Sequence, residues 1–229
     1  MKQLLFAALI SLVTGCTTVQ TETALKTHPD SKAWTDLFAA DLSDAIYPAG
    51  VWVQKDGILS STKKDQAIWT KNEYANFILD FEFQLEPGAN SGLFIYNTDM
   101  KNWVPNTVEV QLLDDVAPQW EKAAANWKCG GVFGHSVPLK SVVKPAGEWN
   151  RMTVRCHGQA ITVLLNGEMV TDLNMQDWKS AKTNPDGSAI PSWLSRPLSE
   201  MATKGRIGLQ GAHGGIPSHF RNLKIKSIE

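Results

Sequence analysis

The sequence predicts an all-β fold of the sandwich type, and three observations lead to that prediction. Short runs of alternating apolar and polar residues, separated by Gly, Pro, Asn and Asp, dominate from Trp34 to Glu229. No long stretch has the apolar period of an amphipathic helix. The length of the chain suits one large all-β domain better than two small ones, so we expect a single core over residues 33–229.

The expected strands follow one another at short intervals along the chain. In the run Phe77–Leu85 every second residue is Phe or Leu, and the residues between them are mostly polar, so one face of that strand should be buried. Asn166-Gly167 is a strong signal for a two-residue hairpin turn. The expected strands are 52–53, 57–60, 68–69, 77–85, 92–96, 108–113, 131–133, 149–157, 160–165, 168–172, 206–210 and 220–228.

Two long segments, 101–128 and 175–204, lack the strand pattern. They hold five tryptophans between them, together with several prolines. We expect them to be loops, with a short helix near 119–126 and another near 197–202. Loops of this length in a compact domain usually cover or form a binding site.

The first residues are typical of an export signal. Lys2 precedes an apolar run, Leu4–Val13, which at about ten residues is too short for the roughly twenty that a membrane helix needs. The sequence Leu-Val-Thr-Gly-Cys at 12–16 resembles a bacterial lipoprotein lipobox, which predicts that residues 1–16 are the signal with its lipid-bearing Cys16. The alternative is an ordinary signal peptide with a cysteine near the cleavage site.

A polar, Thr-rich stretch over residues 17–32 follows and is expected to be a flexible tether. We therefore expect a cell-envelope lipoprotein, periplasmic or anchored to the outer membrane, that meets the membrane through its lipid only. Cys129 and Cys156 are the other two cysteines, and in an oxidising envelope they form either a disulfide or two buried thiols.

The charge balance excludes one class of partner. Lys and Arg number 22 and Asp and Glu 23, for a net charge of −1, and no basic run occurs. A nucleic acid, which needs a basic surface, is therefore not expected as a partner.

A polar face shared by three strands is the first indication of a site. Glu109 and Gln111 alternate with aliphatic residues, Asn90 precedes another strand, and Arg206 and Gln210 repeat the pattern on a third. Such a face forms the floor of a polar cleft.

Seven short motifs, in order along the mature chain, carry a resemblance to a known family. The chain is similar to the 3-keto-disaccharide hydrolase family, also described as 3-keto-glucoside lyase/hydratase domains and formerly as domain of unknown function 1080. The motifs are Asn90–Phe94, Val108–Asp114, Cys129–Gly134, Lys144–Asn150, Leu165–Gly167, Lys204–Gln210 and Phe220–Ile225.

The resemblance implies a concanavalin A-like jelly-roll sandwich, with the two long loops over its concave face. It implies an enzyme that cleaves 3-keto-glycosides by β-elimination across C1 and C2, by hydration, or by both steps as net hydrolysis. A C3 ketone acidifies the C2 proton, so the site needs a base, a donor for the enediolate oxygen and an acid for the leaving oxygen. A separate oxidoreductase would supply the oxidised sugar. The alternative is a non-catalytic glycan-binding lipoprotein with a lectin-like sandwich, and a third reading is a surface-anchored interaction protein.

Three residues are candidates for the chemistry. Glu109 is the expected base, since desolvation of a strand carboxylate raises its pKa toward neutrality; the alternative is an ion pair with Arg206 or Arg221. His213, in a loop flanked by glycine, is expected to be an acid or a metal ligand, or else a solvated surface histidine. Arg206 is expected to bind the enediolate oxygen, or else to hold the sheet together.

Another six residues are candidates for substrate binding. The amides of Asn90, Gln111 and Gln210 would bind sugar hydroxyls, and Trp103 and Trp127 would stack on sugar faces. His135 is a weaker candidate, with a structural or surface role as the alternative. The alternative for the three amides is hydrogen bonding within the sheet, and for the two tryptophans it is packing. No cofactor is predicted, and a divalent metal is left open, because no close-spaced metal-binding motif occurs. Serine hydrolase and nucleotide chemistry are disfavoured, because neither motif is present.

Overall fold

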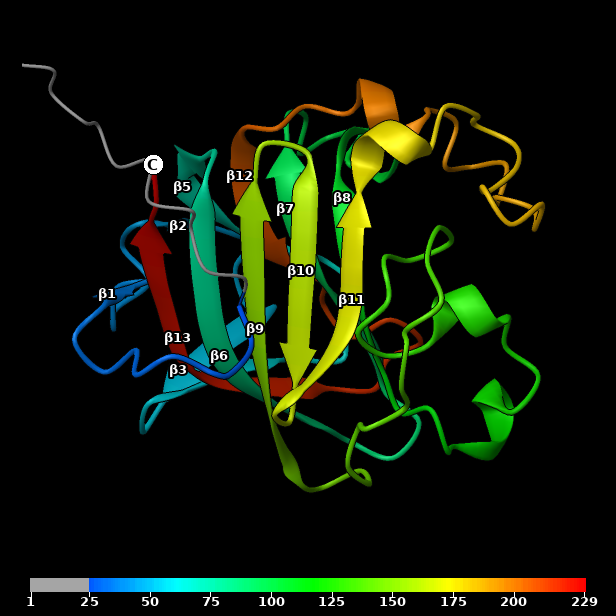
Figure 1. Ribbon diagram of the computed structural model, residues 1–229. Helices are drawn as coiled ribbons and strands as arrows, with labels where there is room; N and C mark the ends of the chain where they lie inside the picture. The colour runs from blue at the N-terminus through cyan, green and yellow to red at the C-terminus, as the bar shows by residue number, and fades with distance from the viewer. Residues whose placement is uncertain (1–24) are drawn as a thin grey trace, which may run out of the picture.

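The computed structural model describes residues 25–229, which form two antiparallel sheets packed face to face (Figure 1). The larger sheet lies in front in Figure 1 and the smaller one behind it. In spatial order the larger sheet contains β11 (Glu168–Asn174), β10 (Ala160–Leu165), β9 (Trp149–His157), β6 (Phe77–Leu85), β13 (Ser218–Ser227), β4 (Ile58–Ser61) and β3 (Trp52–Lys55), with β1 (Thr35–Asp36) paired to β13. The smaller sheet contains β2 (Ala45–Ile46), β5 (Ile68–Tyr74), β12 (Gly205–Leu209), β7 (Asn90–Asn97) and β8 (Val108–Leu113). The predicted all-β jelly-roll sandwich is confirmed.

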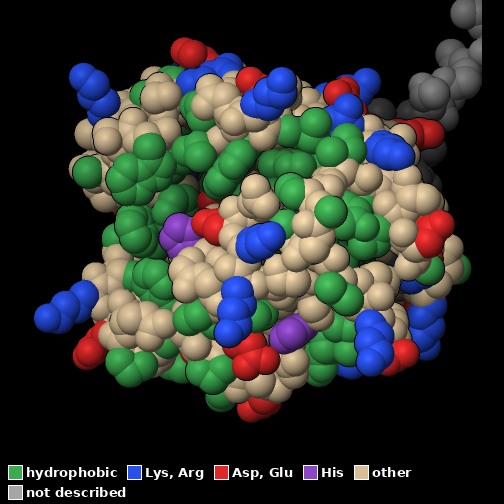
Figure 2. All heavy atoms as spheres, turned by 180° about the vertical axis from the view of Figure 1, so that it is seen from behind, with side chains coloured by type: hydrophobic (Ala, Val, Ile, Leu, Met, Phe, Trp, Pro, Cys, Tyr) green, Lys and Arg blue, Asp and Glu red, His purple; other side chains and the backbone are tan. Residues whose placement is uncertain are grey.

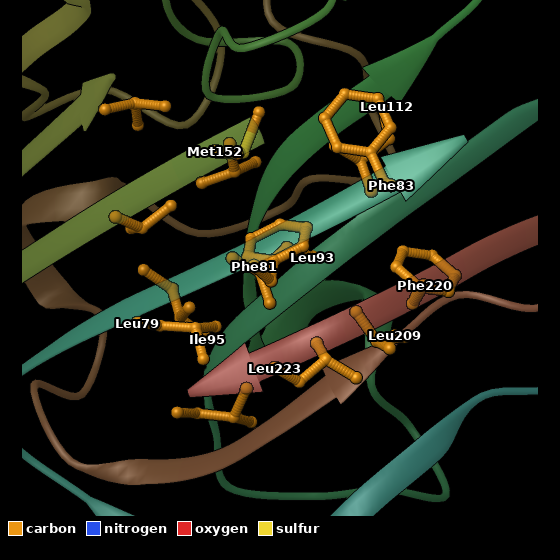
Figure 3. Close-up of a cluster of buried hydrophobic side chains, with 14 of the residues drawn as sticks. Leu79, Phe81, Phe83, Leu93, Ile95, Leu112, Met152, Leu209, Phe220 and Leu223 are labelled. Carbon is orange, nitrogen blue, oxygen red and sulfur yellow. The ribbon is translucent and has the colours of Figure 1, made fainter. Parts of the chain in front are cut away.

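The core lies between the two sheets and follows the period-two pattern of the strands. On β6, Phe77, Leu79, Phe81 and Phe83 are completely buried. Figure 3 shows side chains of β6, β9 and β13 meeting those of β7, β8 and β12 in the space between the sheets. Because successive strand residues point to opposite faces, the residues between the core positions of β7, β8 and β12 face outward.

The two long loops contain only single turns of 3-10 helix. These are Val104–Asn106, Pro118–Trp120, Ala125–Trp127, Met175–Asp177 and Leu198–Glu200. The short helices expected near 119–126 and 197–202 are therefore turns of this kind. The remaining loop residues follow the surface of the sandwich, as Figure 1 shows at its right side.

Near Cys129 the structure revises one expected strand and decides between the two alternatives for the cysteines. Residues 131–133 are not a full strand, because only Val132 forms a bridge, to Val110 on β8. The segment nevertheless follows β8 closely, with Gln111 N–H donating to the Gly131 carbonyl at 2.9 Å. Cys129 and Cys156 are both buried free thiols, so the disulfide alternative is not realised.

The N-terminal segment packs onto the outer face of the larger sheet from His28 onward, earlier than the tether boundary expected at residue 32. The carboxylate of buried Asp80 on β6 accepts hydrogen bonds from the Ser31 hydroxyl at 2.5 Å and from Arg151 at 2.8 and 3.1 Å. His28 makes a 2.7 Å hydrogen bond with the Thr153 hydroxyl. The predicted signal and Cys16 lie outside the described residues. Between residues 25 and 229, no helix has the length and apolar character to cross a membrane.

Candidate active site

The candidate site is a cavity of about 340 Å³ on the outer face of the smaller sheet. Figure 2 shows this side of the molecule: hydrophobic side chains surround a hollow, and a histidine and an acidic side chain meet at its edge. The volume falls within the range of about 300–1,000 Å³ typical of small-molecule sites. Six of the sequence-predicted polar residues line it, namely Asn90, Glu109, Gln111, His135, Gln210 and His213.

The register of β7, β8 and β12 explains why polar residues distant in the sequence meet here. Gly92 on β7 pairs with Gln111 on β8, and Gln210 N–H donates to the Gly92 carbonyl at 2.8 Å. Asn90 lies two residues before Gly92 and accepts a 3.1 Å hydrogen bond from the Gln111 amide. The alternation that buries Val110 and Leu112 therefore turns the amides outward into one cavity.

Glu109 lies at the centre of the cavity floor, and Gly92 makes room for it. A Cβ atom at Gly92 would come within 2.1 Å of the Glu109 Oε1 atom, so the carboxylate leans across β7 where no side chain stands. Burial, with a smaller contribution from the negative charge of Asp65, raises the pKa of Glu109 from 4.5 to about 8.

The ion pair considered as the alternative role of Glu109 is absent from the described part of the chain. The Arg221 guanidinium pairs with Glu82 at 2.5 Å on the larger sheet. Arg206 donates to the backbone carbonyls of Thr70 and Lys71 on β5.

The role expected for Arg206 at the enediolate oxygen does not agree with its position. Arg206 is on the predicted outer face of β12, but it is four residues before Gln210, which is roughly 13 Å along an extended strand. It does not line the cavity, and its guanidinium is held by carbonyls of the neighbouring strand. The alternation of apolar and polar residues correctly predicted the face of β12 that carries Arg206. Its position along the strand and its hydrogen-bond partners depend on the register between the strands, which the alternation does not give.

His213 is paired with an aspartate that the sequence did not reveal. Its Nδ1–H donates to the Asp65 carboxylate at 2.7 Å, and both side chains are about half exposed at the cavity. The two loops meet because Gly211 lacks a side chain: a Cβ atom there would lie 2.5 Å from the Lys64 carbonyl oxygen. Asp65 belongs to no motif, so nothing in the local sequence distinguishes it from other surface aspartates.

Two buried polar atoms at the cavity have no hydrogen-bond partner. They are Gln111 Oε1 and His135 Nε2. The Nδ1–H of His135 donates to the Phe133 carbonyl at 2.9 Å, which leaves Nε2 as an acceptor in the neutral ring. Burial lowers the pKa of His135 to about 4, so the ring is neutral near pH 7. Both atoms are therefore suited to accept a hydrogen bond from a ligand hydroxyl.

Aromatic rings bound the cavity at both ends of the strands and along one side. Trp103 packs on Phe94 of β7, with ring centroids 4.5 Å apart, and the indole of Trp120 donates to the Gly88 carbonyl before β7. Trp127 packs on Phe133 at 5.2 Å, beside β8. Trp103 and Trp127 were expected here from the sequence.

Trp193 completes this side of the cavity, and the sequence indicated only that it lay in a long loop. It meets Trp127 nearly edge to face, with ring centroids 6.3 Å apart. It is 52% exposed, an unusual degree for so large an apolar side chain.

The cavity contains few groups that could hold a metal. Within residues 25–229, no three His, Cys, Asp or Glu side chains come close enough together to coordinate an ion.

Comparison with known proteins gives a family match over most of the chain. The model of the family described as 3-keto-alpha-glucoside-1,2-lyase-like domain matches residues 30–226. Among curated proteins, none is significantly similar in sequence.

The chain is also similar to solved structures of bacterial proteins. One, provisionally named a glycosyl hydrolase from Parabacteroides distasonis ATCC 8503, is 48% identical, with 85% of this chain and 99% of that chain covered and a TM-score of 0.83. A second protein of the same provisional name and organism is 24% identical, with 88% and 86% covered and a TM-score of 0.64. A carbohydrate-binding module, CBM66 from Bacillus subtilis, shares the fold at 12% identity, with 83% and 99% covered and a TM-score of 0.51.

Proposed function

Since this chain belongs to the 3-keto-alpha-glucoside-1,2-lyase-like domain family, we propose that it cleaves 3-keto-glycosides by elimination across C1 and C2. Family membership indicates a carbohydrate-related function, and the proposal concerns the reaction. The observation that carries it is Glu109: a carboxyl with a pKa of about 8 on the floor of a cavity, with a histidine–aspartate pair beside it. A carboxyl whose pKa is shifted toward neutrality in a cavity is typical of a general acid or base.

In this mechanism Glu109 is the base. Its ionised carboxylate takes the C2 proton, the C2–H electron pair becomes part of an enediolate, and the negative charge develops on the C3 oxygen. The amides of Asn90 and Gln210 are the donors at the cavity that could bind this oxygen, in the role first expected of Arg206. A carboxylate with a pKa near 8 is a stronger base than an ordinary one, although only about one in ten molecules holds it ionised at pH 7.

His213 is the acid in the second half of the reaction. The C1–O bond breaks, a C1–C2 double bond forms, and the departing oxygen takes a proton from His213. Asp65 fixes the ring through Nδ1, so Nε2 is the nitrogen that exchanges a proton with the substrate. Addition of water across C1 and C2, with the hydroxyl at C1 and the proton at C2, then gives net hydrolysis.

The experiment uses the soluble chain without residues 1–16 and a 3-keto-glucoside with a chromogenic leaving group, in deuterated water. Release of the leaving group with deuterium incorporated at C2 is the expected result, with parallel reactions containing a chelator to test for a metal. The rate should rise with pH up to about 8, since the ionised form of Glu109 is the active one. A rate that falls over this interval would show that Glu109 acts in its protonated form, and binding without release would remove the elimination proposal.

The second candidate function is glycan binding without catalysis. It is favoured by the tryptophans that bound the cavity and by the unpartnered acceptors of Gln111 and His135, which a sugar hydroxyl would satisfy. The substitution Glu109→Gln distinguishes the two functions, since it preserves the shape of the cavity. A binding protein keeps its affinity and has no turnover to lose.

The proposed substrate has consequences for the protein's partners. A ketone at C3 is not present in an ordinary glycoside, so a separate oxidoreductase must oxidise the sugar first. We expect that enzyme to share the compartment of this chain, which the leader predicts to be the cell envelope.

A further inference from the structure

We propose that the side of the cavity formed by Trp127, Phe133 and Trp193 is a leaving-group subsite, and that it selects flat, apolar aglycones such as aryl groups. The inference rests on the proposed function and adds the class of substrate.

The order of the strands divides the cavity into two halves. Asp65 precedes β5 and His213 follows β12, so this pair lies over the first half of the sheet. Glu109 projects from β8, on the far side of β7 from β12, and leans back over Gly92. The charged residues among those that line the cavity are therefore confined to one half and to the centre.

The other half lies beyond β8 and contains no charged lining residue. Phe133 is beside β8, with its N–H donating to the Glu109 carbonyl at 2.9 Å, so this half begins about one strand spacing from the base. Trp127 contacts both Phe133 and Trp193, and the three rings form one continuous apolar wall. Leu194 extends the wall from the same loop as Trp193.

The loop that carries Trp193 is built to approach this wall closely. Gly134 has a φ of +74°, and a Cβ atom there would come within 2.6 Å of Leu194 Cδ1 and 3.0 Å of Pro191. Trp193 is nevertheless 52% exposed, so the loop packs well while its largest apolar side chain stays open to a ligand. An exposed indole next to a cavity of this size is a suitable surface for stacking an incoming ring.

The chemistry of this half favours an apolar leaving group over a second sugar. A second sugar has several hydroxyls that lose water on binding, and each then needs a partner. Among the buried side-chain atoms of this half, His135 Nε2 is the one without a partner, and it can accept one hydrogen bond. A phenyl group needs no such partner and would bury its faces against the two tryptophans.

The experiment compares phenyl, methyl and glucosyl 3-keto-glucosides as substrates of the wild type and of Trp193→Ala. We expect Trp193→Ala to raise KM for the phenyl substrate by roughly 3- to 30-fold, which corresponds to the binding free energy of one aromatic pair and part of its buried area. KM for the methyl substrate should change little. Trp193→Phe retains a ring and should behave nearly as the wild type. Trp34→Ala, which changes a half-buried tryptophan beside the larger sheet, is the matched control.

A binding measurement separates failure of this inference from failure of the proposed reaction. Calorimetric titration with unoxidised phenyl and methyl glucosides requires no turnover, and phenyl glucoside should bind more tightly to the wild type and lose that preference in Trp193→Ala. Equal binding of both, unchanged by Trp193→Ala, would overturn the aromatic subsite. A higher KM for the glucosyl substrate alone in Trp193→Ala would instead assign this wall to a second sugar.

Discussion

Replacement of Glu109 by glutamine should make the protein more stable at alkaline pH, and the size of the effect follows from the structure. The folded-state pKa of about 8 lies above the ordinary value of 4.5, so between these values the folded protein holds a proton that the unfolded chain releases. Folding stability of the wild type relative to the variant is therefore fully present at and below about pH 4.5, falls as the pH rises toward 8, and is lost above it.

The upper bound of this loss is about 5 kcal/mol, because each unit of pKa difference corresponds to about 1.4 kcal/mol. Glu109 keeps part of its surface open to the cavity, so the measured loss should be smaller, and we expect about 2 kcal/mol. For a domain of this length, 1 kcal/mol shifts Tm by roughly 2–4 °C. The wild type should therefore lose about 4–8 °C relative to Glu109→Gln between about pH 5 and 9.

The assay is a thermal unfolding series of both proteins at closely spaced pH values. Glu148→Gln is the matched control, because Glu148 is exposed at the start of β9 and away from the cavity. Its curve should run parallel to that of the wild type. Parallel curves for Glu109→Gln as well would refute the raised pKa, and with it the argument that burial prepares this carboxyl as a base. Turnover of Glu109→Gln should fall by about 10²- to 10⁴-fold, the usual contribution of a general base.

Three further predictions test the cavity, the N-terminal attachment and the leader. Gly92→Ala should displace the Glu109 carboxylate, because the new Cβ would lie 2.1 Å from the present position of its Oε1. Turnover should then fall by about 100-fold in kinetic assays. If Gly92→Ala caused an additional loss in the Glu109→Gln background, displacement of this carboxylate would not be the cause. Asp80→Ala should cost about 1.5–3 kcal/mol in denaturant unfolding, because it removes charge-assisted hydrogen bonds from Ser31 and from the partly exposed Arg151 guanidinium, and a cost under about 1 kcal/mol would mean that the N-terminal attachment contributes little. Cys16→Ser should move the full chain from the membrane to the soluble fraction in cell fractionation, and retention in the membrane would contradict lipidation.

The strand pattern allowed much of the site's floor to be predicted. Alternation over 108–113 placed Glu109 and Gln111 on the face opposite Val110 and Leu112, and the structure has them so. The reason is geometric: a strand has a side-chain period of two, so the buried residues of a sequence identify its outward face without knowledge of the partner strands. The same rule placed Asn90 and Gln210 on that face.

The pattern could not give the position of a residue along the sheet. Arg206 shares the outward face of β12, yet it is bound to carbonyls of β5 at the end of the strand distant from Gln210. Periodicity is unchanged by movement along the strand, whereas the register between strands depends on contacts that the local sequence does not encode.

The sequence by itself determined the sandwich, its single core, the outward polar face with Glu109 and the family to which the chain belongs. Only the tertiary structure decided that Asp65 orients His213, that Gly92 makes room for the Glu109 carboxylate, and that Trp193 extends an aromatic wall. These features depend on loops and strands distant in the sequence approaching within a few ångströms. Periodicity reports which face of one element is buried, but such approaches depend on the packing of several elements at once.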